Sequence, residues 1–146
     1  MNGLELQDAI RRAGLTTPII FISGASDLPA AIQAMKGGAL DFLTKPFNEE
    51  QLLAAIRGAM ERDRAARAGR EEREAARARF DSLTAREQEV CLLVARGLLN
   101  KQIACELGNT EKTVKVHRAR VMEKLGVESV AGLVRLVDRA GRGGNR

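Results

Sequence analysis

The sequence has few aromatic residues, few cysteines and a single histidine. Its 146 residues include four Phe, no Trp and no Tyr, which argues against a protein that stacks single-stranded bases on aromatic rings. Two cysteines, Cys91 and Cys105, do not form a disulfide framework and indicate a reducing compartment. No Cys-His spacing around His117 is typical of a zinc site. We therefore expect neither a metal nor a cofactor.

Long apolar runs are also missing. The run from Pro18 to Ile22 is typical of the longest ones and is far too short to cross a bilayer. The N-terminus, Met1-Asn2-Gly3-Leu4-Glu5, has no basic region followed by an apolar region, as a signal peptide would. We therefore expect a cytoplasmic protein without a membrane partner. With 45% hydrophobic and 29% charged residues, the composition is that of a globular chain.

The net charge of +5 is unevenly distributed. Residues 1–56 carry four basic and six acidic residues, a net charge of −2. Residues 57–79 carry eight Arg and five acidic residues, and residues 80–146 carry twelve basic and eight acidic residues, net charges of +3 and +4. This asymmetry indicates that the C-terminal part binds nucleic acid.

Residues 1–60, which we call the head, have the pattern of an α/β fold. Apolar residues recur at helical spacing in three stretches, and two short apolar stretches are typical of strands buried in a parallel sheet. Asn48 is a suitable N-cap for the last of the helices. The expected order is helix, strand, helix, strand, helix, over residues 4–13, 19–22, 28–35, 40–44 and 48–60.

The head also carries a recognisable set of motifs. Ile-Ser-Gly at 22–24 is followed by Ala-Met-Lys-Gly-Gly-Ala-Leu-Asp-Phe-Leu-Thr-Lys-Pro-Phe at 34–47. These motifs resemble the second half of a response-regulator receiver domain, which is flavodoxin-like, and most closely the FixJ type. The resemblance implies that Ser23 contacts a phosphoryl group and that Lys45 pairs with the phosphorylated carboxylate. It also implies that Phe42 changes rotamer on activation and that the Lys45-Pro46 bond is cis.

The acidic residues of that family have no counterpart in the head. Its only aspartates, Asp8, Asp27 and Asp41, do not stand at the positions of the acidic pair or the phosphoacceptor. Mg²⁺ needs several oxygen ligands, usually carboxylates and waters. We therefore expect no phosphoacceptor, and a sensor kinase as partner only if the natural chain is longer. Two strands leave sheet edges open, so we also expect the head to be marginally stable or self-associating.

Residues 61–79, which we call the connector, contain only Glu, Arg, Asp, Ala and one Gly. Most of these are strong helix formers. Opposite charges stand four residues apart at Asp63–Arg67, Arg67–Glu71 and Arg70–Glu74. Because no heptad of large apolar residues is present, the pattern favours an exposed helical spacer over a coiled coil.

Residues 80–146, which we call the tail, are predicted to form four helices. Ser82 or Thr84 begins the first, and Glu87 completes a capping box with Thr84. A short helix over 100–107 ends at Gly108-Asn109, and Thr110 begins a third helix over 111–124, which Gly126 ends. A fourth helix contains residues 130–137. Four short helices with a glycine turn between the second and third match helix-turn-helix geometry.

The motifs of the tail are more specific than this pattern. They are Leu-Thr-Ala-Arg-Glu-Gln-Glu-Val at 83–90, Gly-Leu-Leu-Asn-Lys-Gln-Ile-Ala at 97–104, Thr-Glu-Lys-Thr-Val-Lys-Val-His-Arg at 110–118 and Lys-Leu-Gly-Val at 124–127. Together they resemble a LuxR-type DNA-binding domain over residues 80–140. The resemblance implies double-stranded DNA as partner and places the helix 111–124 in the major groove.

The resemblance also assigns residues to this interface. Lys115, Val116 and Ala119 match positions that face base edges, where Lys donates to guanine and the apolar side chains touch thymine methyl groups. Backbone contacts, which position the protein without reading sequence, are expected from Lys101, Lys112, Thr113, Arg118, Arg120 and Lys124. His117 matches a family position and is expected to be structural or to contact the DNA backbone. Cys91 and Cys105 are expected to be small buried apolar residues.

The best interpretation is a bacterial transcription regulator that combines an α/β partial receiver with an all-α helix-turn-helix domain. The alternative is an interaction protein that pairs with intact response regulators. Residues 28–60 are the surface expected to form a homodimer or heterodimer. An enzyme such as a Cys-His hydrolase is disfavoured, because no third group orients such a pair. Residues 142–146 are expected to be a frayed basic end.

Overall fold

The structure is a computed structural model that describes residues 1–24 and 27–143. The chain divides into two compact units, Met1–Ala68 and Gly69–Arg146. One helix, α3 (Glu49–Asp81), contributes its first part to the first unit and its last part to the second. No helix of the described residues is both long enough and apolar enough to cross a membrane.

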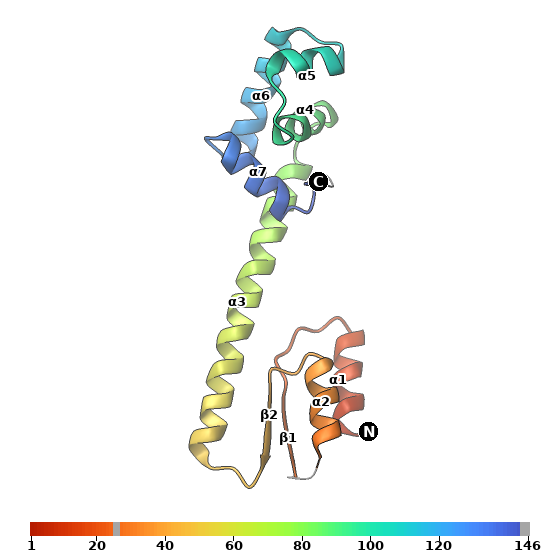
Figure 1. Cartoon of the computed structure of the whole chain (residues 1–146), viewed down its shortest axis with the longest axis vertical. Coiled ribbons are helices and arrows are strands. Elements are labelled where there is room, and N and C mark those ends of the chain that lie inside the picture. Colours follow the sequence, from red (N-terminus) through yellow and green to blue (C-terminus); the bar gives the residue numbers. More distant parts are fainter. Residues whose placement is uncertain (25–26, 144–146) are drawn as a thin grey trace. The chain divides into compact units, whose positions relative to one another are not determined.

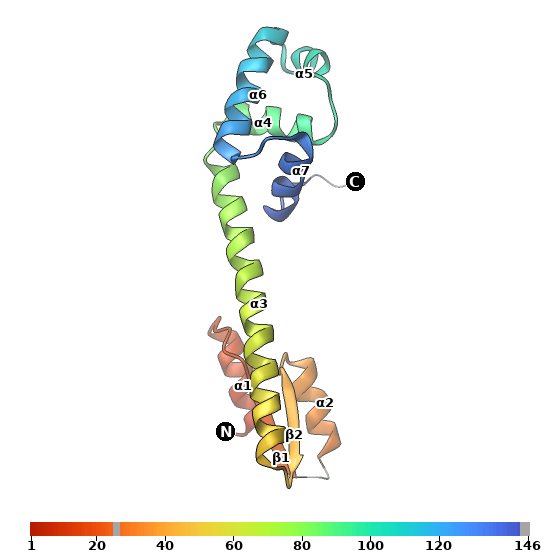
Figure 2. The ribbon, with the colours of Figure 1, turned by 90° about the vertical axis from the view of Figure 1, so that its left-hand side faces the viewer.

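The first unit is α/β, as predicted. Its elements are α1 (Gly3–Arg12), β1 (Ile20–Gly24), α2 (Leu28–Lys36), β2 (Asp41–Lys45) and the beginning of α3. The two strands pair in parallel, with Ile20 opposite Asp41 and Gly24 opposite Lys45. Helices α1 and α2 lie on one side of this sheet and the first part of α3 on the other (Figures 1 and 2).

Specific contacts hold these layers together. Gln7 on α1 is buried, and its Nε2 donates to the carbonyl oxygen of Ala34 at 2.8 Å, which ties α1 to α2. The rings of Phe21 and Phe42 stack across the two strands with centroids 6.4 Å apart. On the other side, Arg62 Nη1 of α3 donates to the carbonyl oxygen of Leu40 at 2.6 Å, just before β2. The small core that results does not cover all the apolar side chains of this unit.

Helix α3 joins the last helix predicted in the head to the helical connector. Asn48 caps it as predicted: Oδ1 of Asn48 accepts from the Gln51 amide at 2.8 Å, and Oε1 of Gln51 accepts from the Asn48 amide at 3.0 Å. The helix continues for 33 residues without interruption at Gly69. Of the three predicted charge pairs, the structure forms Asp63–Arg67, at 2.8 Å.

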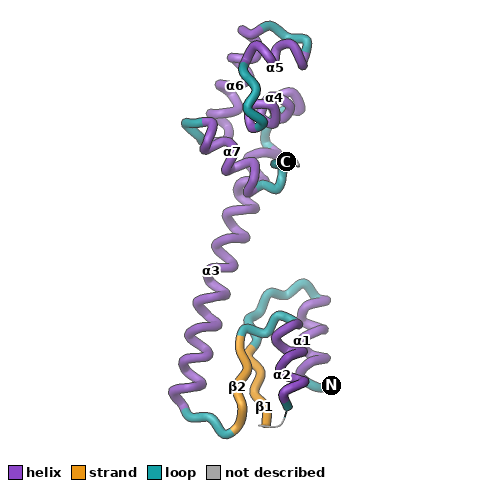
Figure 3. Tube along the Cα trace, in the orientation of Figure 1, coloured by secondary structure: helices purple, strands orange, loops and turns teal. Residues whose placement is uncertain are grey.

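The second unit is all-α, also as predicted. Helices α4 (Ala85–Ala95), α5 (Asn100–Leu107), α6 (Glu111–Leu125) and α7 (Val130–Arg139) are joined by loops (Figure 3). Their inward faces form one apolar core, in which the fully buried residues include Val90, Ile103, Val114, Val121, Leu125 and Leu133. Gly108 and Gly126 end α5 and α6 with φ of 65°, a backbone conformation that favours glycine.

The end of α3 belongs to this core. Ala76 and Phe80 are buried within it at 5% and 4% exposure. The guanidinium of Arg142 lies over the Phe80 ring, 6.0 Å from its centroid, and approaches Asp81 at 3.5 Å. The core thus reaches back to Ala76, ahead of the tail boundary expected at residue 80. Arg142 of the expected frayed end thus contacts the end of α3, and residues 144–146 of that end lie outside the described residues.

Candidate nucleic-acid interface

Helix α6 has one buried side and one exposed side. Thr110 caps its start, because Thr110 Oγ1 accepts from the Thr113 amide at 3.2 Å. Val114, Val121 and Leu125 are fully buried against the other helices. Because the buried positions recur at helical spacing, the remaining positions form a face that is free to contact a partner.

The three residues predicted to read bases lie together on this exposed face. Lys115 and Ala119 are exposed, and the Val116 side chain is 45% exposed although it is apolar. Two of the residues predicted to contact the DNA backbone, Lys112 and Arg120, are also exposed on α6. The spacing of these five residues, at 112, 115, 116, 119 and 120, places them on one side of the helix.

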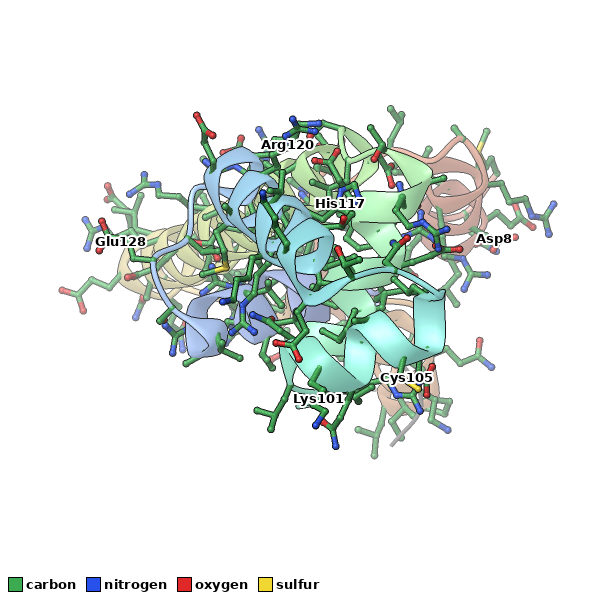
Figure 4. The ribbon with its side chains drawn as sticks, turned by 90° about the horizontal axis from the view of Figure 1, so that it is seen from above. Asp8, Lys101, Cys105, His117, Arg120 and Glu128 are labelled. Carbon is green, nitrogen blue, oxygen red and sulfur yellow. The ribbon has the colours of Figure 1, made fainter. Side chains whose placement is uncertain are left out.

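The other predicted backbone contacts lie at the edges of this face. Thr113 is half-buried, with its Oγ1 3.0 Å from Thr110 Oγ1. Arg118 Nη1 donates to Asn100 Oδ1 at 3.0 Å, which connects α6 to the start of α5. Lys101 is exposed on α5, and Figure 4 shows it well apart from Arg120 of α6. The structure thus groups five of the nine predicted residues on one helical face.

Lys124 has a partner within the protein. Its Nζ donates to Glu87 Oε1 at 2.6 Å, and the Glu87 side chain is only 2% exposed. The same oxygen accepts from the Thr84 amide at 2.9 Å, which completes the predicted capping box of α4. The Lys124 ammonium and the Thr84 donors outweigh burial and lower the pKa of Glu87 to about 2. This pair joins α6 to the start of α4.

The sequence indicated Glu87 as a capping residue but not as the partner of Lys124. The capping box is local, whereas Glu87 and Lys124 are 37 residues apart. Only the packing of α4 on α6 brings them together. Lys124 is therefore engaged inside the tail, unlike Lys112 and Lys115.

The single histidine and the two cysteines differ in their burial. His117 is half-buried on α6, and its buried Nδ1 has no hydrogen-bond partner among the described residues. Cys91 is fully buried, as predicted, and burial raises the pKa of its thiol to about 11. The prediction for Cys105 was wrong, because this residue is exposed on the outer side of α5. Within residues 1–24 and 27–143, no three potential metal ligands gather.

The residues of the head that resemble the receiver switch lie on the two strands. Ser23 and Lys45 stand near the carboxyl ends of β1 and β2, and Ser23 Oγ donates to Asp27 Oδ2 at 3.3 Å. Lys45 is exposed and precedes a cis bond to Pro46, as the resemblance implied. The ring of Phe42 stacks on Phe21.

The three aspartates of the head lie on separate elements. Asp8 of α1 pairs with Arg11 and Arg12 at 2.8 and 2.6 Å. Asp27 precedes α2, and Asp41 begins β2, where its Oδ1 accepts from the Phe42 amide at 2.8 Å. Asp41 and Lys45 therefore stand at opposite ends of the same strand.

Comparisons with known proteins agree with both units. Residues 81–137 match the model of the bacterial regulatory proteins of the luxR family, and residues 1–57 match the response regulator receiver domain. Nodulation protein W of Bradyrhizobium diazoefficiens is 45% identical over 145 residues, which cover 99% of this chain and 64% of that protein. The transcriptional regulatory protein FixJ of Rhizobium meliloti is 41% identical, over 98% of this chain and 70% of its own length.

The solved structures give the same result. The response regulator StyR is 47% identical and superposes with a TM-score of 0.82, over 95% of this chain and 70% of StyR. The fold and the exposed helix α6 thus define a receiver joined to a LuxR-type helix-turn-helix domain. The chain belongs to the response regulator family of FixJ. It spans slightly less than two thirds of the length of Nodulation protein W.

Proposed function

We propose that the chain is a sequence-specific regulator of transcription that inserts α6 into the major groove of double-stranded DNA. The observation that carries this proposal is the exposed face of α6, where Lys115, Val116 and Ala119 stand beside Lys112 and Arg120. Lys115 donates to the acceptors of guanine, and Val116 and Ala119 contact thymine methyl groups. An exposed valine on a basic helix face has no role in the apolar core, which supports a role in base contact.

The remaining polar residues fix the position of the helix on DNA. We assign phosphate contacts to Lys101, Lys112, Thr113, Arg118 and Arg120. Lys124 was also predicted to contact the DNA backbone, and its ammonium is bound to Glu87 at 2.6 Å. We assign to it the positioning of α6 against α4.

Replacing Lys115 by Ala should reduce the discrimination between the preferred duplex and a duplex with substituted guanines. We expect a loss of about 1–3 kcal/mol, because the base loses its hydrogen-bond partner. Binding of the 146-residue chain to duplexes selected from a random pool, measured by fluorescence anisotropy at fixed salt, gives this ratio.

The matched control is Lys112→Ala, on the same face of α6. This variant should weaken binding to all duplexes equally and lower the slope of log K against log salt by about 1, because a phosphate contact is lost. An unchanged ratio for the Lys115 variant would remove this residue from the base-reading set.

We also propose that the residues of this chain accept no phosphoryl group. Asp8 is engaged with Arg11 and Arg12, and Asp41 stands at the end of β2 away from Lys45. Incubation with acetyl phosphate and Mg²⁺ should therefore leave the intact mass unchanged. A mass increase of one phosphoryl group would overturn this assignment. Its loss in an Asp27→Asn variant would identify Asp27 as the acceptor.

The second candidate function is that of an interaction protein. It is supported by the exposed apolar side chains of α2 and the first part of α3, which are Leu28, Ile32, Met35, Leu53, Ile56 and Met60. Pairing through residues 28–60 would cover this surface, either with a second copy or with an intact response regulator. Mixed-chain pull-down with a response regulator, compared with a DNA mobility shift of the same sample, distinguishes the two functions.

A further inference from the structure

A hollow of about 280 Å³ lies in the second unit, where the last part of α3 faces α7. Small residues, Ala75 and Ala76 of α3 and Gly132 of α7, line it and leave its space unfilled. Val127 and Leu136 give the hollow an apolar lining. None of the residues assigned above to DNA contact lines this hollow, so it is a separate surface of the tail.

Three arginines converge on the hollow from two elements. Arg79 comes from α3, and Arg135 and Arg139 come from successive turns of α7. The one acidic residue in its lining is Glu72, so the formal charge there is positive. The described residues provide no ion pair within 4.0 Å for any of the three arginines.

Among residues 1–24 and 27–143, the hydrogen bonding of these arginines is also incomplete. Arg79 Nη1 donates to the carbonyl oxygen of Leu125 at 3.3 Å, and the other N–H donors of its guanidinium have no partner among these residues. Arg135 and Arg139 are like charges at i,i+4, a spacing that destabilises a helix. An anion placed between them would remove this repulsion and accept from both guanidinium groups.

We propose that this hollow binds a small organic dianion. The acidic groups of the ligand, either carboxylate or phosphate, accept from Arg135, Arg139 and Arg79. Its compact apolar body packs on Val127 and Leu136. The hollow is close in size to the lower end of the range for small-molecule sites, so the ligand must be small. The lining is positively charged, so the ligand must be an anion.

Calorimetric titration of the 146-residue chain with phthalate and with phenyl phosphate at pH 7.5 and constant ionic strength tests this proposal. We expect one site per chain for at least one of the two probes, with an affinity at least about tenfold higher than for inorganic phosphate, which has no apolar body. The two probes distinguish a carboxylate ligand from a phosphate ligand. Failure of both to bind above the level of inorganic phosphate would overturn the proposal.

Three variants locate the site. Arg135→Gln/Arg139→Gln should lower the affinity at least about tenfold, because two charge-assisted hydrogen bonds are lost. Ala75→Leu, which keeps all three arginines, should have a similar effect by filling the hollow. Lys112→Gln/Lys115→Gln, on the DNA-binding face of α6, should leave the affinity unchanged.

Loss of probe binding in the α6 variant alone would place the anion on the DNA-binding face and contradict the proposal. A stoichiometry of one probe per two chains would indicate a site between copies and would also contradict it. A DNA mobility shift of the same samples separates failure of this proposal from failure of the proposed DNA binding, because the variants of the hollow should retain DNA binding. If the unmodified chain did not bind DNA, the calorimetric result for the hollow would still stand.

Discussion

Replacing Lys124 by Met should lower the free energy of unfolding of the second unit by about 3 kcal/mol, because it leaves a buried charge without its partner. Glu87 is 2% exposed, and its second oxygen, Oε2, has no hydrogen-bond partner among the described residues. Removal of Lys124 leaves the Thr84 amide, 2.9 Å from Oε1, as the remaining hydrogen-bond partner of this carboxylate among the described residues. Urea unfolding followed by circular dichroism measures the loss, since the chain has no Trp or Tyr to report by fluorescence.

A double-mutant cycle isolates the pair. Glu87→Gln keeps an oxygen for the Thr84 amide but removes the charge, so Glu87→Gln/Lys124→Met should be more stable than Lys124→Met alone. If the double variant were no more stable than Lys124→Met, the loss would come from the packing of the Lys124 stem and not from the charge.

The same pair makes stability depend on pH. The pKa of Glu87 lies at about 2 in the folded protein, against 4.5 for the free side chain. Its contribution to stability is therefore present above pH 4.5 and is lost as the pH falls toward 2. In Lys124→Met the folded-state pKa rises, so the dependence on pH in this window should weaken. An equally steep dependence in both proteins would contradict the assignment.

Replacing Phe80 by Ala should also destabilise the second unit by about 3 kcal/mol, because the substitution opens a cavity in its core. The Phe80 side chain is 4% exposed, packs with the core that contains Leu83 and Leu133, and carries the Arg142 guanidinium on its ring. Hydrogen exchange of the amides of α4 and α7 would report the loss in this unit alone.

Arg77→Ala is the matched control, since Arg77 is exposed and stands one turn before Phe80 on the same helix. Its replacement should change stability by less than about 0.5 kcal/mol. Equal effects of the two substitutions would mean that Phe80 is not part of the core of the second unit.

The helices of the tail were predictable because their signals are local. Thr84, Thr110 and Gly126 stand where the structure begins or ends α4 and α6. The alternation of helices and strands in the head was predictable for the same reason, since apolar spacing and the motifs around Lys45 determine it. Asn48 likewise caps α3 as expected.

The features that the sequence did not reveal depend on contacts between distant residues. Lys124 was predicted to contact the DNA backbone, and its contact with Glu87 depends on the packing of α4 on α6. Cys105 was expected to be buried because its neighbours Ala104 and Leu107 are apolar, yet it points outward from α5. Phe80 is a single aromatic residue that follows a highly charged segment, so no periodic apolar pattern predicted that it is buried in the core.

The most direct test of the account is the affinity of the unmodified 146-residue chain for its selected duplex, relative to random duplex, at physiological salt. Sequence-specific regulators bind their sites about 10³-fold or more tightly than random DNA. The account predicts a ratio of this size without a phosphoryl donor, and its reduction by Lys115→Ala. Equal affinity for both duplexes would contradict the central claim that the exposed face of α6 reads DNA sequence.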